Sequence, residues 1–452
     1  MAGLYHNIFT DKQIENLFSA ETQVSYMLAF ERALANAEGT LGVIPADAAE
    51  VIAAVCRESK WNTEALAEQT LLAGNPAIPL VKMLTQRVAQ RDTEAAKYVH
   101  FGATSQDVLD TALMLQLQAA TTYITHKNNE LQNQLAKLAS AHRDTVMIGR
   151  TLLQQARPIT FGYKVAGWLE ALLRAGQGLE FAQQNTFALQ LGGAVGTLAT
   201  LGEHGPAVVT HVVEALGLAA PLLPWHSQRD RLVDFAAKLG ILCGNLGKMA
   251  QDLTLLMQTE VGEVAEAAAP GKGGSSAMPH KRNPVSATFI VAIARRTPAL
   301  VGTLLAGLAH HEQERAAGAW HAEWEVLPEL VRLTAAALGH ANDLISGLEV
   351  NAERMLRNLE LTQGLIYAED VTALLTPKLG KAEAHQLVEE ASHRAQREGL
   401  HLRECLAQHF DIYKYLNNNT LEHVFDAHRA TGLSQFFTDQ VLARFHTSTS
   451  TT

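Results

Sequence analysis

Cysteine is scarce in this sequence, and its scarcity excludes two classes of protein. Three cysteines occur among the 452 residues, and Cys56, Cys243 and Cys405 lie far apart with no CxxC spacing. Widely spaced thiols, odd in number, exclude a disulfide framework and a cysteine-based zinc cluster. They are typical of a protein from a reducing compartment.

Runs of like charge and long apolar runs are missing as well. The 36 basic and 46 acidic residues leave a formal net charge of −10, and the chain has no basic block. This balance argues against nucleic-acid or membrane partners. The segment 1–12 lacks a basic region followed by an apolar run, so we expect no signal peptide. No apolar run reaches the length of a membrane span, and we expect a soluble, cytoplasmic protein.

The common signatures of metal and nucleophile enzymes are also absent. The sequence has no HExxH, no Cys/His ligand spacing and no GxSxG, which are the usual marks of zinc sites and of serine hydrolases. Gly271-Lys272 is not part of a nucleotide phosphate loop, because Gly273 stands where that motif requires Ser or Thr. We therefore expect acid–base chemistry without a metal or a cofactor.

Helical periodicity dominates what is present. Its clearest run lies between Arg231 and Glu263, where apolar residues alternate steps of three and four. Such a seam predicts long helices that pack nearly parallel or antiparallel in a bundle. We therefore predict an all-α fold, with five long helices in the middle of the chain at residues 107–142, 161–182, 231–263, 285–311 and 321–348.

We expect three helical domains. The first is predicted to open with one helix from Asp11 to Glu38, capped by Thr10, and Pro298 and Pro328 are expected to kink or interrupt two of the long helices. In the last domain the run Asn417–Asn419 predicts a loop. The predicted boundaries are 1–106 for the N-terminal domain, 107–350 for the central bundle and 351–452 for the C-terminal domain.

Three polar stretches lie at the ends of the predicted long helices. Bundles bring helix ends together within and between subunits, so a shared site is geometrically reasonable. Several cations and hydroxyls without paired carboxylates predict an anionic substrate with several carboxylates. A lone Arg or His on a helix is more often structural, so the combination carries the prediction. The candidate residues are His100, Thr104, Ser105, Arg150, Thr151, Gln154, Ser275, Ser276, Lys281, Asn283 and Arg315.

The last of these stretches, residues 271–284, reads Gly-Lys-Gly-Gly-Ser-Ser-Ala-Met-Pro-His-Lys-Arg-Asn-Pro. Its glycines let backbone N–H groups approach a ligand closely. Gly, Ser and Pro also make ordinary surface loops. An ordinary loop does not need hydroxyls, a histidine and two cations at once, so the composition favours a functional loop.

Residues 274–284 resemble the signature of the fumarase/aspartase superfamily, which includes adenylosuccinate and argininosuccinate lyases. The stretches 100–107 and 149–160 resemble the two other active-site segments of that superfamily, in the same order. The resemblance implies a mostly helical subunit of three domains. It also implies a homotetramer with a core of twenty helices, five from each chain, and active sites shared among three subunits.

The same resemblance implies roles for single residues. Ser275 would exchange a proton with a substrate carbon, with its alkoxide stabilised by glycine amides and Lys281. His100 is the other candidate for acid–base work. The substrate-binding positions would be Thr104, Ser105, Arg150, Thr151, Gln154, Ser276, Asn283 and Arg315.

One position departs from the lyases of this superfamily. They carry His after Gly-Arg-Thr, the usual candidate for the general acid, and this sequence carries Leu152. An amine or hydroxide leaving group needs that proton, whereas a carboxylate, with a pKa of about 4, does not. The departure therefore favours a reaction in which the departing group is a carboxylate.

Within the superfamily, one reaction expels a carboxylate, namely the reverse of the lactonisation of 3-carboxy-cis,cis-muconate to 4-carboxymuconolactone. Residues 314–324 resemble the branch of the superfamily that catalyses this lactonisation. We therefore expect a cofactor-free cycloisomerase acting on a small tricarboxylate. One alternative is elimination of the adenylosuccinate-lyase type, with His100 or His280 as the acid. A structural oligomer that has lost catalysis is the other.

Overall fold

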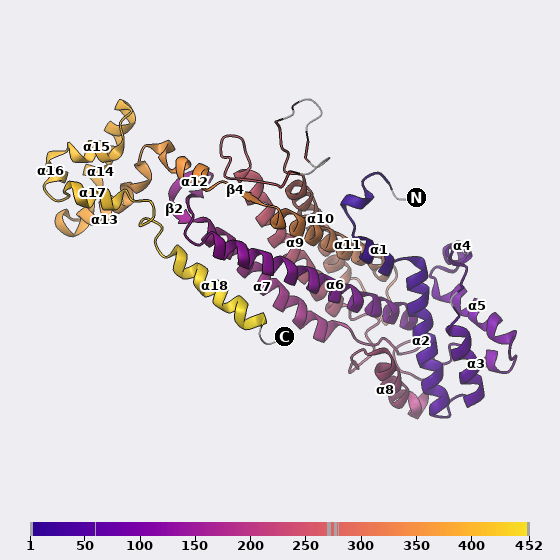
Figure 1. Ribbon diagram of the computed structural model, residues 1–452. Coiled ribbons are helices and arrows are strands. Elements are labelled where there is room, and N and C mark those ends of the chain that lie inside the picture. The colour runs from indigo at the N-terminus through magenta and orange to yellow at the C-terminus, as the bar shows by residue number, and fades with distance from the viewer. Residues whose placement is uncertain (1–2, 59, 269–272, 275–277, 279, 450–452) are drawn as a thin grey trace. The chain divides into compact units, whose positions relative to one another are not determined.

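The computed structural model describes residues 3–58, 60–268, 273–274, 278 and 280–449 (Figure 1). Helices make up most of this part of the chain, which confirms the predicted all-α fold. The described strands form two small antiparallel pairs. Strand β1 (Val146–Thr151) pairs with β2 (Gln154–Thr160), and β3 (Val264–Ala265) pairs with β4 (Glu349–Val350).

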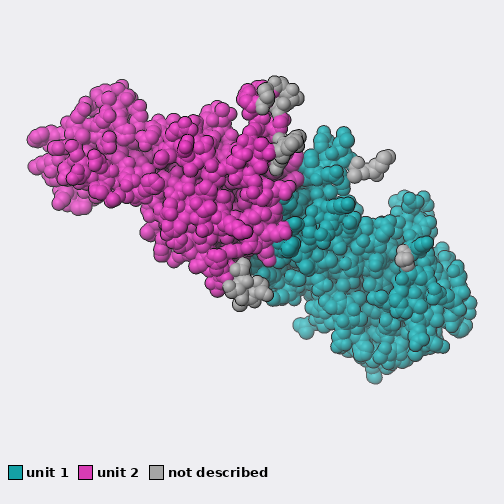
Figure 2. Space-filling view, viewed as in Figure 1, with its two compact units in different colours: residues 1–128, 175–246, 292–339 teal, residues 129–174, 247–291, 340–452 magenta. Residues whose placement is uncertain are grey.

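The chain divides into two compact units, shown in two colours in Figure 2. Unit 1 contains residues 1–128, 175–246 and 292–339, and unit 2 contains residues 129–174, 247–291 and 340–452. Both units are discontinuous because long helices contribute residues to each. The division into three sequential domains is a different partition and stays a prediction.

All five predicted long helices are present. They are α6 (Ser105–Ala141), α7 (Phe161–Thr186), α9 (Asp230–Leu256), α10 (Val285–Leu308) and α11 (Ala319–Ser346). Pro298 lies inside α10 and Pro328 inside α11, so neither proline interrupts its helix, and the expected kink stays a prediction. Leu327 and Leu330 beside Pro328 are fully buried, and packing of such an apolar face outweighs the hydrogen bond that a proline removes.

The apolar seam of α9 is buried along its whole length. Burying a leucine side chain contributes roughly 1.5–3 kcal/mol, so this seam is a main source of the bundle's stability. Its residues are at most 4% exposed: Leu232, Phe235, Leu239, Leu242, Leu246, Met249, Leu253 and Leu256.

The predicted helix from Asp11 to Glu38 is two helices, α1 (Lys12–Leu17) and α2 (Ala20–Thr40). The Asp11 carboxylate accepts the N–H groups that open α1, and the Ser19 hydroxyl accepts an N–H at the start of α2. Thr10 instead donates to the Glu15 carboxylate. The capping prediction was therefore wrong, since Asp11 and Ser19 supply the acceptors that the two helix starts require.

The rest of the N-terminal region packs against α2. Helices α3 (Ala46–Cys56) and α8 (Gly205–Leu216) contact α2 directly. Helices α4 (Thr63–Ala73) and α5 (Ala77–Ala89) complete this part of unit 1. The shared core buries large apolar side chains fully, among them Phe30, Ile52, Leu80, Leu84 and Val88.

Shorter helices follow α11 in unit 2. Those from α13 to α17 pack around their own apolar core, coloured orange to yellow in Figure 1. The run Asn417–Asn419 does not form the expected loop, because Asn417 caps α17 by accepting the N–H of Thr420. The bounds are α12 (Ala352–Leu359), α13 (Ala368–Leu379), α14 (Lys381–Glu398), α15 (Leu402–Ala407), α16 (Phe410–Tyr413), α17 (Asn418–Val424) and α18 (Ser434–Thr449).

Candidate active site

In unit 1, the loop that leads into α6 is held by one buried carboxylate. Asp107 is fully buried, and its Oδ2 accepts the N–H of Thr104 at 3.0 Å and that of Gly193 at 2.9 Å. Its Oδ1 accepts the N–H of Gly192 at 3.0 Å and lies 2.7 Å from His226 Nε2. A carboxylate with this many donors is a rigid anchor. It fixes the loop against the glycine-rich segment around residue 192.

Arg315 lies over the start of α6 and contacts three neutral groups. Its Nη1 donates to Thr104 Oγ1 at 2.8 Å, its Nη2 to Ser105 Oγ at 3.4 Å, and its Nε to Gln106 Oε1 at 3.3 Å. Among the described residues no carboxylate pairs with this guanidinium. A positive charge held by neutral hydroxyl and amide groups is suited to bind a carboxylate.

A buried ion cluster is linked to this loop through Gln106. The sequence pattern did not reveal this cluster. Arg229 is fully buried and pairs with Asp110 of α6 and Glu323 of α11. Gln106 links the cluster to Arg315, because its Nε2 donates to Asp110 Oδ2 at 3.1 Å while its Oε1 accepts from Arg315. Gln106 and Asp110 share α6, but Arg229 and Glu323 come from distant segments of the chain, so no local motif marks the cluster.

His100 opens the same loop in a strained conformation. Its φ of 60° lies in the left-handed region, which non-glycine residues rarely occupy. Its Nδ1 lies 2.7 Å from Oε1 of Glu31, a side chain that is 1% exposed. Burial lowers the pKa of His100, but the charge and hydrogen bond of Glu31 and the charge of Asp107 outweigh burial, and the pKa is raised.

In unit 2, the predicted polar loop at 149–160 is a β-hairpin. Thr151 pairs with Gln154, and the two residues between them, Leu152 and Leu153, have φ values of 49° and 66°. Positive φ at both central positions is the geometry of a type I′ turn, which usually carries Asn-Gly. The sequence therefore lacked the usual hairpin signal. Leu152 is 96% exposed at this tip and Leu153 75%.

One basic residue lies on the hairpin, next to its tip, and a second lies on the helix that follows the hairpin. Arg150 makes a two-pronged ion pair with Glu263, at 2.6 and 3.0 Å, and Glu263 is fully buried. Lys164 on α7 was not identified from the sequence. Burial lowers its pKa, the Asp252 carboxylate opposes this, and the cations Lys248 and Arg150 lower the pKa further. Arg150 is thus already neutralised, and its predicted contact with substrate stays a prediction.

The described ends of the glycine-rich stretch are joined by a hydrogen bond between Gly273 and Asn283. Gly273 has a φ of 68°, and its carbonyl accepts the N–H of Asn283 at 2.9 Å. Lys281 is exposed, and its Nζ donates to Asn283 Oδ1 at 2.9 Å. Arg282 makes a two-pronged ion pair with Glu349. Ser275 and Ser276 lie outside the described residues.

The predicted site residues fall into two groups. His100, Thr104, Ser105 and Arg315 come together within unit 1. Arg150, Thr151, Gln154, Lys281 and Asn283 belong to unit 2. Within the described chain, no group of three or more His, Cys, Asp or Glu side chains is placed to hold a metal ion.

Comparison with known proteins identifies the family. Residues 2–298 match the family described as Lyase, and residues 364–441 match the family described as Adenylosuccinate lyase C-terminus. The chain is 47% identical over 443 residues to a 3-carboxy-cis,cis-muconate cycloisomerase of Pseudomonas aeruginosa, which covers 98% of this chain and 96% of the relative. The chain belongs to the fumarase/aspartase superfamily of lyases.

Solved structures of this superfamily match the whole fold. A 3-carboxy-cis,cis-muconate lactonizing enzyme from Pseudomonas putida superimposes with a TM-score of 0.93 at 42% identity, over 99% of both chains. A relative with another activity is also similar. A nitrosuccinate lyase of Streptomyces davaonensis is 41% identical over 98% of this chain and 94% of the relative.

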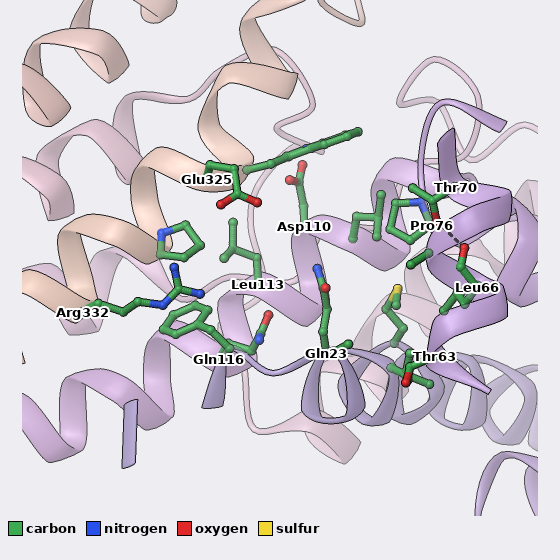
Figure 3. A pocket seen from close by; sticks show the side chains of 18 residues that line it. Gln23, Thr63, Leu66, Thr70, Pro76, Asp110, Leu113, Gln116, Glu325 and Arg332 are labelled. Carbon is green, nitrogen blue, oxygen red and sulfur yellow. Dashed lines mark hydrogen bonds between the residues drawn. The ribbon is translucent and has the colours of Figure 1, made fainter. Parts of the chain in front are cut away.

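A cavity of about 330 Å³ in unit 1 is a separate feature. Figure 3 shows Asp110, Gln116, Glu325 and Arg332 among the side chains that line it. The remaining lining is mostly apolar and comes from α2, α4, α6 and α11 and from Phe18 and Pro76, which precede α2 and α5. None of the described residues that match the superfamily's active-site segments lines this cavity, so it is not the candidate active site.

Proposed function

We propose that this chain is a cofactor-free cycloisomerase that interconverts 3-carboxy-cis,cis-muconate and 4-carboxymuconolactone. This reaction belongs to the protocatechuate branch of the β-ketoadipate pathway of aromatic catabolism. The similarity to cycloisomerases over the full length of the chain supports the proposal. The observation that carries it is Leu152, which presents a hydrocarbon at the hairpin tip where superfamily lyases carry a histidine acid.

Lactonisation forms one C–O bond and adds one proton to carbon. A substrate carboxylate oxygen adds to a double bond, the electron pair moves to the neighbouring carbon, and that carbon takes up a proton. In reverse, the proton leaves and the carboxylate departs as a stable anion, so no acid is needed for it. Ser275 is the proposed proton carrier.

The charges of the substrate need fixed partners. Arg315 is the proposed anchor for one carboxylate, with the hydroxyls of Thr104 and Ser105 beside it, because its charge has neutral partners. Such preorganised donors also stabilise the anion that forms when the C–O bond shifts. Lys281 is the proposed cation that stabilises the alkoxide of Ser275. The further proposed substrate contacts are Arg150, Thr151, Gln154, Ser276 and Asn283.

A β-elimination from a succinyl compound is the alternative reaction. The match of residues 364–441 to the family described as Adenylosuccinate lyase C-terminus favours it. The relative named nitrosuccinate lyase points the same way. For an amine leaving group, as in adenylosuccinate, His100 or His280 supplies the acid that Leu152 cannot, and fumarate is one product.

Ultraviolet absorbance separates the two functions. The purified chain is incubated with 3-carboxy-cis,cis-muconate, with adenylosuccinate and with nitrosuccinate. We expect the absorbance of the conjugated diene to fall on the first substrate, because lactonisation removes a double bond, and no fumarate to form from the other two. Release of fumarate without any loss of the diene would overturn the proposal.

We further propose a homotetramer in which subunits share active sites. Helix α10 is, by length and composition alone, apolar enough to cross a membrane, although its apolar run is interrupted, and 22% of its most apolar 18-residue segment is buried within the chain. Arg295 and Arg296 stand in its middle, and charges at that depth of a membrane are costly. Partner subunits are therefore the proposed cover. No nucleic acid or membrane partner is proposed, and the proposed location is the cytoplasm.

A further inference from the structure

Two buried glutamates lie about two turns apart on α2. Glu31 and Glu38 are each 1% exposed, and a spacing of seven residues places them on one face of the helix. Oε2 of Glu31 and both carboxyl oxygens of Glu38 have no hydrogen-bond partner among the described residues. Burying a polar group without a partner is costly, so such groups in a native core require an explanation.

Glu38 has a strongly raised pKa. Burial first, and then the charge of Glu31, raise the pKa of Glu38 to about 8. Glu38 is therefore mostly protonated at pH 7. Oε1 of Glu31 lies 2.7 Å from Nδ1 of His100. A carboxyl oxygen at this distance from a ring nitrogen favours the imidazolium form of the histidine.

The backbone around His100 leaves its ring little freedom. The residue has a φ of 60°, and two residues later Gly102 has a φ of 74°, where a Cβ would lie 2.6 Å from Leu201 Cδ2. Thr104, which contacts Arg315, follows closely. Since Nδ1 is engaged by Glu31, Nε2 is the ring nitrogen that remains for another ligand. No residue in the described ranges hydrogen-bonds to it.

We infer that Glu31 is a positioning residue that holds His100 as an imidazolium, with its Nε2–H presented to a substrate carboxylate. The charged groups that face His100 are Glu31 of α2 and Asp107 of α6. Both are acidic, and both favour the cation. This role of His100 rests on the proposed function, because it places a second cation near Arg315 for a substrate with several carboxylates. Glu31 acts through His100 and does not touch the substrate.

Glu31→Gln tests the inference, because it keeps the shape of the side chain and removes its charge. We expect the pKa of His100, followed by the NMR signal of its Cε1–H, to fall by about one pH unit or more, since a neighbouring opposite charge shifts a pKa by that order. His100→Gln assigns the signal. Glu50→Gln is the control, because Glu50 is exposed on α3.

Activity supplies the second readout. Activity that needs the imidazolium is lost as pH rises through the pKa of His100. A lower pKa therefore moves the alkaline limb of kcat/KM to lower pH in Glu31→Gln. At pH 7 we expect KM to rise about tenfold and kcat to change little, because the contact binds a carboxylate in both ground and transition states. Glu31→Asp keeps the charge and is expected to restore most of the loss.

Two results would overturn the inference. One is a His100 pKa that does not change in Glu31→Gln, and the other is a loss of kcat at unchanged KM, which would make His100 a proton-transfer group. If Glu31→Gln does not fold, a wild-type pKa of His100 below the ordinary value of about 6.5 decides against it. If the wild-type protein does not act on 3-carboxymuconate but the pKa of His100 still falls in Glu31→Gln, the proposed function alone is refuted.

Discussion

Arg315 and Arg150 show how partners decide what an arginine does. Both were predicted from the sequence to bind substrate. Arg315 contacts hydroxyl and amide oxygens, while Arg150 is paired with the buried carboxylate of Glu263. The charge of the first is available to an anion, and the charge of the second is already balanced.

Arg315→Lys is expected to lower kcat/KM by roughly a hundredfold, because an ammonium cannot replace the planar fork that contacts three groups. Steady-state kinetics on 3-carboxymuconate measures the effect. Arg397→Ala, which removes an exposed arginine of α14, serves as the control and is expected to leave kinetics unchanged. Equal kinetics for Arg315→Lys and wild type would remove Arg315 from the site.

Glu38→Gln is expected to make the protein more stable at alkaline pH. The pKa of Glu38 is about 8 in the folded chain, against about 4.3 for an unperturbed glutamate. The native carboxyl therefore costs stability as pH rises from about 4.3 to 8, and the cost is fully present above pH 8. A neutral amide escapes that cost, which is on the order of 5 kcal/mol for a shift of this size.

Thermal unfolding at several pH values measures this difference. We expect the Tm of Glu38→Gln to match that of the wild type at pH 4.5 and to exceed it by several degrees at pH 8.5. A difference that stays constant across this range would show that Glu38 does not titrate in the folded chain.

At the scale of elements, three helices are joined by one buried ion cluster. Arg229, at the start of α9, bridges Asp110 of α6 and Glu323 of α11. Breaking a buried pair leaves an uncompensated charge in the core. Such a cluster contributes geometry more than net stability, and here it fixes the helix ends that carry Gln106 and Arg315.

Asp110→Asn is therefore expected to destabilise the protein by about 3–5 kcal/mol. Denaturant unfolding measures the loss. Glu329→Gln is the matched control, since the Arg296–Glu329 pair between α10 and α11 is partly exposed, and pairs of that kind contribute about 1 kcal/mol or less. Similar losses for the two variants would contradict the assigned role of the cluster.

At the scale of the whole molecule, the apolar surface of α10 is the feature that calls for partner subunits. Leu305 on this helix is 52% exposed within the chain. Leu305→Glu is expected to shift the proposed tetramer toward smaller species, because a charge cannot be buried in an apolar interface without a partner. Activity is expected to fall with it, since the proposed sites need more than one subunit.

Native mass spectrometry measures the assembly, with a wild-type mass expected at about four times 49.0 kDa. Leu71→Glu is the control, because Leu71 is 86% exposed on α4 and lies outside the long-helix bundle. A monomeric wild type, or a Leu305→Glu variant that remains a tetramer, would contradict the proposed interface.

The sequence alone determined the features that depend on near neighbours in the chain. The seam from Leu232 to Leu256 predicted a long buried helix, because side chains three and four residues apart share one helix face. The stretch 274–284 predicted the superfamily, because its chemistry is local. Leu152 predicted the type of leaving group for the same reason.

The tertiary structure decided which groups meet. Glu31 and His100 are 69 positions apart, and Arg315 and Thr104 are 211 apart, so no local spacing could mark either contact. The hairpin at Leu152 and Leu153 formed without its usual turn residues, and the helix expected from Asp11 broke at Ser19. Each outcome depends on packing and charge balance between distant segments, which a pattern along the chain does not contain.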